Sequence, residues 1–70
     1  MNQKILRAAS AVAPSPRDTV GDWTYNAVKH GALTLQERDE ILVEHGSSKL
    51  SASQLVVQVQ RGVIRNPVIA

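Results

Sequence analysis

The chain contains no cysteine and no phenylalanine, and it has one tryptophan and one tyrosine. Without cysteine it cannot form disulfides, and a zinc site would have only His30 and His45 as nitrogen ligands. A chain of 70 residues buries only about 60% of the surface that its unfolded form exposes. Association of two copies is the simplest remaining way to enlarge such a core, so we expect a homodimer.

Long apolar runs are also missing. The longest stretches of large apolar residues are Ile41–Val43 and Leu55–Val57, so we expect no transmembrane helix and no membrane partner. Lys4 and Arg7, followed by alanines and an A-x-A triplet, superficially resemble a secretory signal peptide, but the apolar region is too short. The absence of cysteine fits a reducing compartment, and we expect a cytoplasmic protein.

Motifs that carry catalysis are absent as well. The sequence has no cysteine nucleophile, no G-x-S-x-G, no phosphate-binding glycine loop and no H-E-x-x-H. His30 and His45 each precede a glycine that can end a helix, a position where histidine usually acts as a cap or dipole partner. We therefore expect no enzyme activity, no cofactor, no metal and no small-molecule substrate.

Proline and glycine divide the chain into segments whose apolar spacing is typical of helices. We predict an all-α fold: a small bundle of three to four short helices at about residues 3–13, 16–30, 34–45 and 51–61, with an extended C-terminal arm. We expect residues 1–70 to form one domain. It divides into a basic N-terminal helix (1–14), a trihelical core (15–61) and the arm (62–70).

Three of these helices begin with a capping pattern. Ser15 followed by Pro16 predicts a start near residue 16, while Thr34 and Ser51 each open a capping box that continues in a Glu or Gln three residues later. The last segment is ambiguous, because residues 55–60 are rich in valine and could instead form an edge strand.

The expected core is built around Trp23, the only large aromatic ring apart from Tyr25. On the helix at 34–45, we expect Leu35, Ile41 and Leu42 to face inward, with His45 as a further candidate.

Charge is segregated along the chain. Residues 1–17 carry three cations and no acid, residues 45–70 also carry three cations and no acid, and residues 36–44 carry four acids and one arginine. Such segregation suggests an anionic partner for the two ends, or a self-complementary assembly in which the ends meet the middle. Ordinary solvated faces would also explain it.

We predict a helix-turn-helix regulator of transcription that binds double-stranded DNA, with residues 51–61 as the recognition helix. The connection at 46–50 is longer than the usual turn, and the acidic helix before it must face away from DNA. The base-reading candidates are Ser53, Gln54, Gln58 and Arg61. The phosphate-contact candidates are Lys4, Arg7, Lys49 and Arg65.

The alternative is a protein-binding regulator or inhibitor that docks on a larger protein machine, for example the transcription apparatus. It would use the basic N-terminal helix and the apolar arm, which could instead cover the domain's own core or cross to a second copy. Binding of RNA or single strands is disfavoured, because only Trp23 and Tyr25 could stack on bases. The protein-interface candidates are Val57, Val63, Ile64, Val68 and Ile69.

Overall fold

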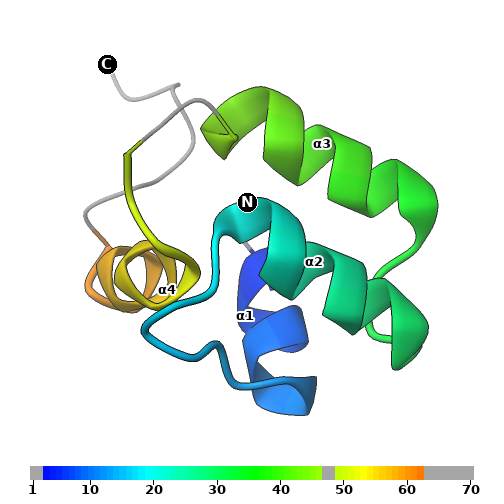
Figure 1. The fold of residues 1–70 in the computed structure, drawn as a ribbon, viewed down its shortest axis with the longest axis horizontal. Coiled ribbons are helices and arrows are strands. Elements are labelled where there is room, and N and C mark those ends of the chain that lie inside the picture. Colours follow the sequence, from blue (N-terminus) through cyan, green and yellow to red (C-terminus); the bar gives the residue numbers. More distant parts are fainter. Residues whose placement is uncertain (1–2, 47–48, 63–70) are drawn as a thin grey trace.

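A computed structural model describes residues 3–46 and 49–62, which form four α-helices and no strand (Figure 1). The predicted all-α bundle is confirmed, and the ambiguous segment after Ser51 is a helix. Apart from Gly62, the predicted arm lies outside the described residues. The helices are α1 (Gln3–Ala11), α2 (Val20–Lys29), α3 (Leu35–His45) and α4 (Ala52–Gln60).

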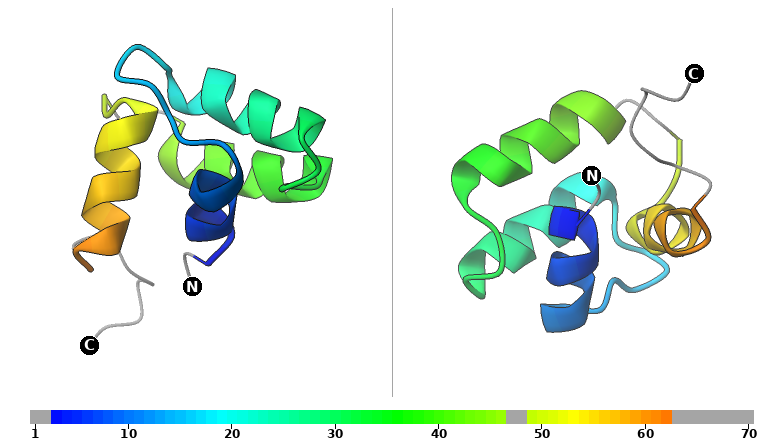
Figure 2. Two further views of the ribbon diagram at one scale, coloured as in Figure 1. Left: turned by 90° about the horizontal axis from the view of Figure 1, so that it is seen from below. Right: turned by 180° about the vertical axis from the view of Figure 1, so that it is seen from behind.

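Helix α2 is the element against which the others are arranged. It packs mainly on α3 and also contacts α1 and α4, while α1 and α4 pack against each other. Figure 2 shows α2 and α3 side by side, with α4 on the other side of the molecule. The two consecutive helices α3 and α4 are therefore not a principal packing pair.

The core is centred on Trp23, as predicted. Its side chain is fully buried, and its indole Nε1 donates a hydrogen bond of 2.7 Å to the Val12 carbonyl. This bond satisfies the ring's polar atom and joins the end of α1 to α2. The other buried apolar residues are Ile5, Ala8, Val20, Ala27, Leu33, Ile41, Ala52, Leu55, Val56 and Val59.

Two of the three predicted helix starts are confirmed by reciprocal capping boxes. Thr34 accepts from the Glu37 amide and Glu37 accepts from the Thr34 amide, both at 3.0 Å. Ser51 and Gln54 make the same pair of bonds at the start of α4. Gly31 follows α2 with a φ of 79°, the left-handed conformation expected where glycine ends a helix.

The predicted start of the second helix is wrong. Helix α2 begins at Val20, and its N-cap is Thr19, whose hydroxyl accepts from the Asp22 amide at 3.0 Å. The Ser15 amide instead donates to the Asp18 carboxylate at 3.0 Å. A serine and an aspartate three residues apart can satisfy a turn as well as a helix cap. Helix α1 also ends at Ala11 rather than at residue 13.

The prediction that Leu35 faces inward is also wrong, because its side chain is 69% exposed. Ile41 is fully buried, Leu42 is partly buried and the His45 side chain is 14% exposed. Six positions place Leu35 and Ile41 about 120° apart around the helix axis, so one face cannot bury both. Helix α3 thus contributes a single fully buried residue to the core.

No helix in residues 3–46 or 49–62 has the length and apolar character needed to cross a membrane.

The revised start of α2 predicts a difference between two alanine variants. Thr19→Ala should lower the free energy of unfolding by about 1 kcal/mol, because it removes the N-cap acceptor. Ser15→Ala should cost less than about 0.5 kcal/mol, because Ser15 serves an exposed turn. Urea denaturation followed by circular dichroism measures both, and a larger loss in Ser15→Ala would place the helix start at Ser15 after all.

Candidate nucleic-acid interface

The outward side of α4 carries a polar stripe. Four of its residues, Ala52, Leu55, Val56 and Val59, point into the core, so the intervening positions face outward. Most of these positions line a shallow hollow of about 240 Å³. All four predicted base-reading residues meet there, together with the predicted interface residue Val57. The lining residues are Leu50, Ser53, Gln54, Val57, Gln58 and Arg61.

A second hollow of about 480 Å³ adjoins the first at the start of α4. Leu50 and Gln54 line both hollows, so the two are neighbours on the surface. The second hollow is also lined by Arg17 and Lys49. We call the combined surface the α4 groove: a line of polar side chains with Arg17 and Lys49 toward one end and Arg61 toward the other.

Arg17 was not among the predicted phosphate contacts. It is distant from α4 in the sequence, where it belongs to the basic segment 1–17. The connection before α2 brings it to the groove, because the Ala52 amide donates to the Asp18 carbonyl at 3.0 Å. Among the described residues that line the groove, Asp18 is the only acid, and its carboxylate accepts from the Ser15 amide.

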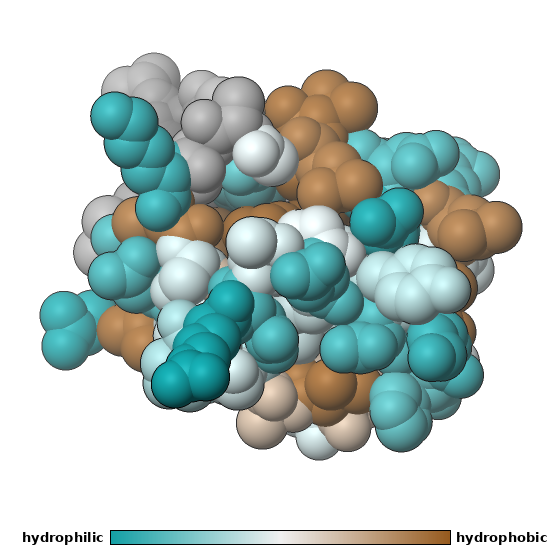
Figure 3. Space-filling model, in the orientation of Figure 1, coloured by the Kyte–Doolittle hydropathy of each residue, from teal (hydrophilic) through white to brown (hydrophobic). Residues whose placement is uncertain are grey.

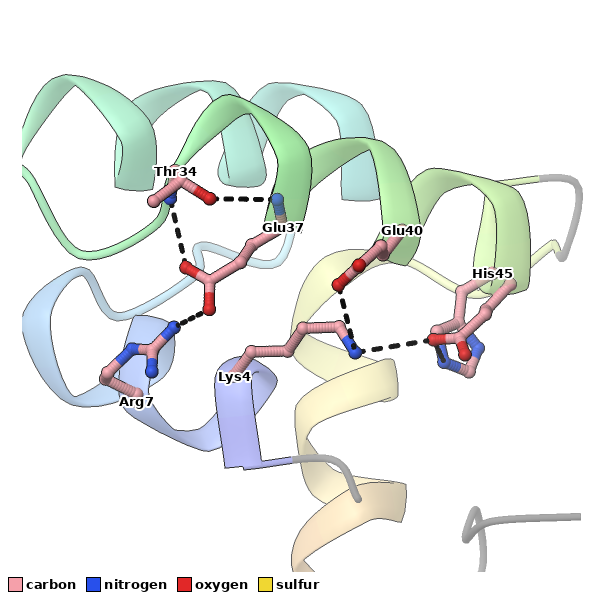
Figure 4. Close-up of polar contacts among 7 residues, drawn as sticks. Lys4, Arg7, Thr34, Glu37, Glu40 and His45 are labelled. Carbon is pink, nitrogen blue, oxygen red and sulfur yellow. Dashed lines mark hydrogen bonds and ion pairs between the residues drawn. The ribbon is translucent and has the colours of Figure 1, made fainter.

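Lys4 and Arg7, both predicted phosphate contacts, instead face α3 (Figure 4). Lys4 Nζ lies 3.9 Å from a Glu40 oxygen and 3.8 Å from a Glu44 oxygen, and the lysine side chain is only 18% exposed. Arg7 pairs with the Glu37 carboxylate through Nη2. These two cations of α1 therefore offset acids of α3 and do not line the α4 groove.

Glu37 is the best-connected acid of α3. Its carboxylate accepts from the Thr34 amide and from the Arg7 guanidinium (Figure 4). The backbone bond first, and the arginine second, hold the pKa of the Glu37 carboxyl below its usual range. Arg7 also donates through Nε to the Ala32 carbonyl at 3.1 Å, so one guanidinium joins α1 to both the α2–α3 connection and α3.

The two histidines do not meet. His30 is the C-cap of α2, as predicted from its place before Gly31, and His45 Nε2 lies 4.0 Å from Glu44. Within residues 3–46 and 49–62, no cluster of three or more potential metal ligands is present. The remaining predicted site residues lie outside the described part of the chain: Arg65, Val63, Ile64, Val68 and Ile69.

Comparisons with protein-family models, curated proteins and solved structures found no match. The chemistry of the α4 groove, where amide and hydroxyl side chains lie beside cations, is therefore the guide to function.

The contacts of Glu37 predict an acid-dependent loss of stability. Because its pKa is lowered in the folded state, the stabilising contribution is complete above the unfolded pKa and is lost as pH falls through the folded pKa, below about pH 4. Glu37→Gln should therefore flatten the fall of unfolding free energy in that range. Asp22→Asn is the matched control, because Asp22 is likewise the third residue of its helix and its side chain makes no ion pair with any other described residue. If Glu37→Gln and the wild type lose stability equally as pH falls, the contacts of Glu37 are not the source of the acid-dependent loss.

Proposed function

We propose that the protein is a small, non-catalytic regulator of transcription that binds double-stranded DNA through the α4 groove. The observation that supports this proposal is the gathering of Ser53, Gln54, Gln58 and Arg61 on one hollow face, beside a second hollow that Arg17 and Lys49 line. Arginine and glutamine have side chains suited to guanine and adenine edges in the major groove. Cations at the two ends of the face would contact phosphates on either side.

The dimensions of α4 suit this role. Its nine residues make a rod about 14 Å long, and the major groove, about 12 Å wide, admits an α-helix. Gln54 and Gln58 are one helical turn apart, about 6 Å along the axis. Their side chains could therefore reach different base pairs while Arg61 extends the same line.

The distribution of charge also favours α4 as the face toward DNA. The acids of α3 would repel phosphates, but Glu37, Glu40 and Glu44 are paired with Arg7 and Lys4. Within residues 3–46 and 49–62, the cations that line the α4 groove have no ion pair with an acid. The surface potential is thus divided between a partly neutralised acidic side and a basic side.

In this proposal α4 takes the place of a recognition helix, as the helix-turn-helix prediction requires. Helix α4 packs against α1 and α2, while α3 packs on α2. We also propose that the protein acts in the cytoplasm and as a homodimer, because a dimer would present two copies of α4 to neighbouring half-sites of DNA.

The second candidate, a protein-binding regulator, is favoured by a different surface. Val43 and Leu35 of α3 are 83% and 69% exposed, and neither lines the α4 groove. The predicted docking element on the N-terminal side is less available, because the cations of α1 are engaged with α3. Variants on α3 and on α4 therefore separate the two functions.

Binding to duplex DNA of random sequence tests the electrostatic part of the proposal. If Arg17, Lys49 and Arg61 contact phosphates, the logarithm of the binding constant should fall with the logarithm of salt concentration with a slope of about −2.7 for each protomer on the DNA. Arg61→Ala should reduce the magnitude of this slope by about 0.9 for each protomer. Fluorescence anisotropy of labelled DNA measures both.

Lys29→Ala is the matched control, because Lys29 is an exposed cation of α2 that lies over the Tyr25 ring and does not line the groove. It should leave the slope unchanged. Absence of binding at low salt, or an equal effect of Lys29→Ala and Arg61→Ala, would refute the proposed interface.

Base reading by the glutamines predicts a sequence-dependent effect. Once a preferred duplex has been selected from a random pool, Gln58→Ala should weaken binding to it by about 1–3 kcal/mol and leave binding to random DNA nearly unchanged. Gln60→Ala is the control, because Gln60 is an exposed glutamine of the same helix outside the hollow. Competition anisotropy with both duplexes provides the comparison, and equal losses on the two would remove Gln58 from base reading.

A further inference from the structure

The outward face of α3 carries two exposed apolar side chains in an acidic setting. Leu35 and Val43 are 69% and 83% exposed, and Asp39 lies midway between them in the sequence. Residues four positions apart are neighbours on one side of a helix, so the three form a row that we call the α3 row. Figure 3 shows brown, apolar surface over α3 interrupted by teal, polar surface.

The charge beside this row is negative. Asp39 and Glu40 are exposed, and Glu40 shares Lys4 with Glu44. Arg38, the one arginine of α3, is turned toward α2, where it donates to the Gly21 carbonyl at 3.2 Å and the Thr24 hydroxyl at 3.3 Å. A segment that covers the α3 row should therefore be apolar and positively charged.

The sequence contains one such segment beyond the described helices. Residues 63–70 read Val-Ile-Arg-Asn-Pro-Val-Ile-Ala, which is two apolar pairs on either side of an arginine, with no acid. In an extended bound segment, Ile64 and Val68 would be about 13 Å apart. Leu35 and Val43 are about 12 Å apart along α3. The apolar pairs therefore match the row in spacing, and Arg65 falls near Asp39.

A second copy is better placed than the same chain to supply this segment. The connection from α3 leads directly into the start of α4, and α4 then carries the chain about 14 Å further before residue 63. In the left view of Figure 2, the yellow start of α4 lies near the end of α3, and its orange end points away from α3. If two copies exchanged residues 63–70, both α3 rows would be covered in the same way. A dimer with two-fold symmetry requires such equivalent contacts.

We propose that the α3 row binds residues 63–70 of a second copy of this chain. Leu35 and Val43 contact the two apolar pairs, and Asp39 pairs with Arg65. This inference rests on the proposed homodimer, but it does not depend on DNA binding, because the row does not include residues of the α4 groove.

Sedimentation equilibrium of the full chain tests the apolar part. The wild type should be dimeric at about 0.1 mM, and Val43→Lys should raise the dimer dissociation constant at least about tenfold. Ser10→Lys on the exposed side of α1 makes the same change in charge and should leave the constant unchanged. Wild-type protein that stays monomeric up to about 1 mM overturns the homodimer itself.

An exchange of charge tests the direct contact. Asp39→Lys and Arg65→Asp should each weaken dimerisation about tenfold, and the double variant should recover most of the loss, because the pair is restored with its signs reversed. A double variant no better than the singles overturns the pairing. If the double variant is monomeric and still recovers thermal stability, residues 63–70 bind the α3 row of their own chain. That outcome overturns binding by a second copy.

DNA binding, measured by anisotropy on the same proteins, separates this inference from the proposed function. Retained binding in a protein that never dimerises refutes the α3 row and the homodimer while leaving the α4 groove intact. A dimer that depends on the row but binds no DNA supports the row and refutes the proposed function.

Discussion

Burial of Trp23 is the interaction on which the rest of this small structure depends. A chain of 70 residues with no cysteine and no phenylalanine has few large side chains with which to fill a core. Trp23 supplies the largest of them from α2, the helix that contacts the other three. Its indole bond to the Val12 carbonyl fixes where α1 ends relative to α2, and so also where the cations of α1 lie.

Helix α3 is attached in a different way. Ile41 is its one fully buried residue, and its other ties are polar: Arg7 and Lys4 reach it from α1, and Arg38 reaches α2. Exposed ion pairs contribute only about 0–1 kcal/mol each. Because so little of α3 is buried, one side of this helix stays exposed. The pairing with its acids also uses Lys4 and Arg7, which would otherwise extend the basic surface beyond α4.

Local chemistry explains which features could be predicted. The boxes at Thr34 and Ser51 involve residues three positions apart, so the sequence alone placed the starts of α3 and α4 within a residue. The same helical period placed Gln54 and Gln58 on one outward side of α4. The structure confirms that these residues share a hollow, and their role toward DNA stays a prediction.

Tertiary geometry explains what could not be predicted. Ser15 and Thr19 both precede an acid three residues later, and nothing local decides which of them caps the helix. The pairing of Lys4 and Arg7 with acids of α3 could not be predicted, because these partners are at least thirty positions away in the sequence. Arg17 reaches the α4 groove only through the connection before α2, so its contribution required the fold.

The start of α4 has a consequence for how an anion would be held there. Free backbone amides at a helix start often form a rigid cradle for phosphate. Here the Ala52 amide donates to the Asp18 carbonyl and the Gln54 amide donates to the Ser51 hydroxyl, so most of that cradle is already occupied. A phosphate would instead meet long, flexible side chains that tolerate several positions. In the proposed complex with DNA, such contacts would allow the protein to move along the duplex, and the polar side chains of α4 would set its preferred position.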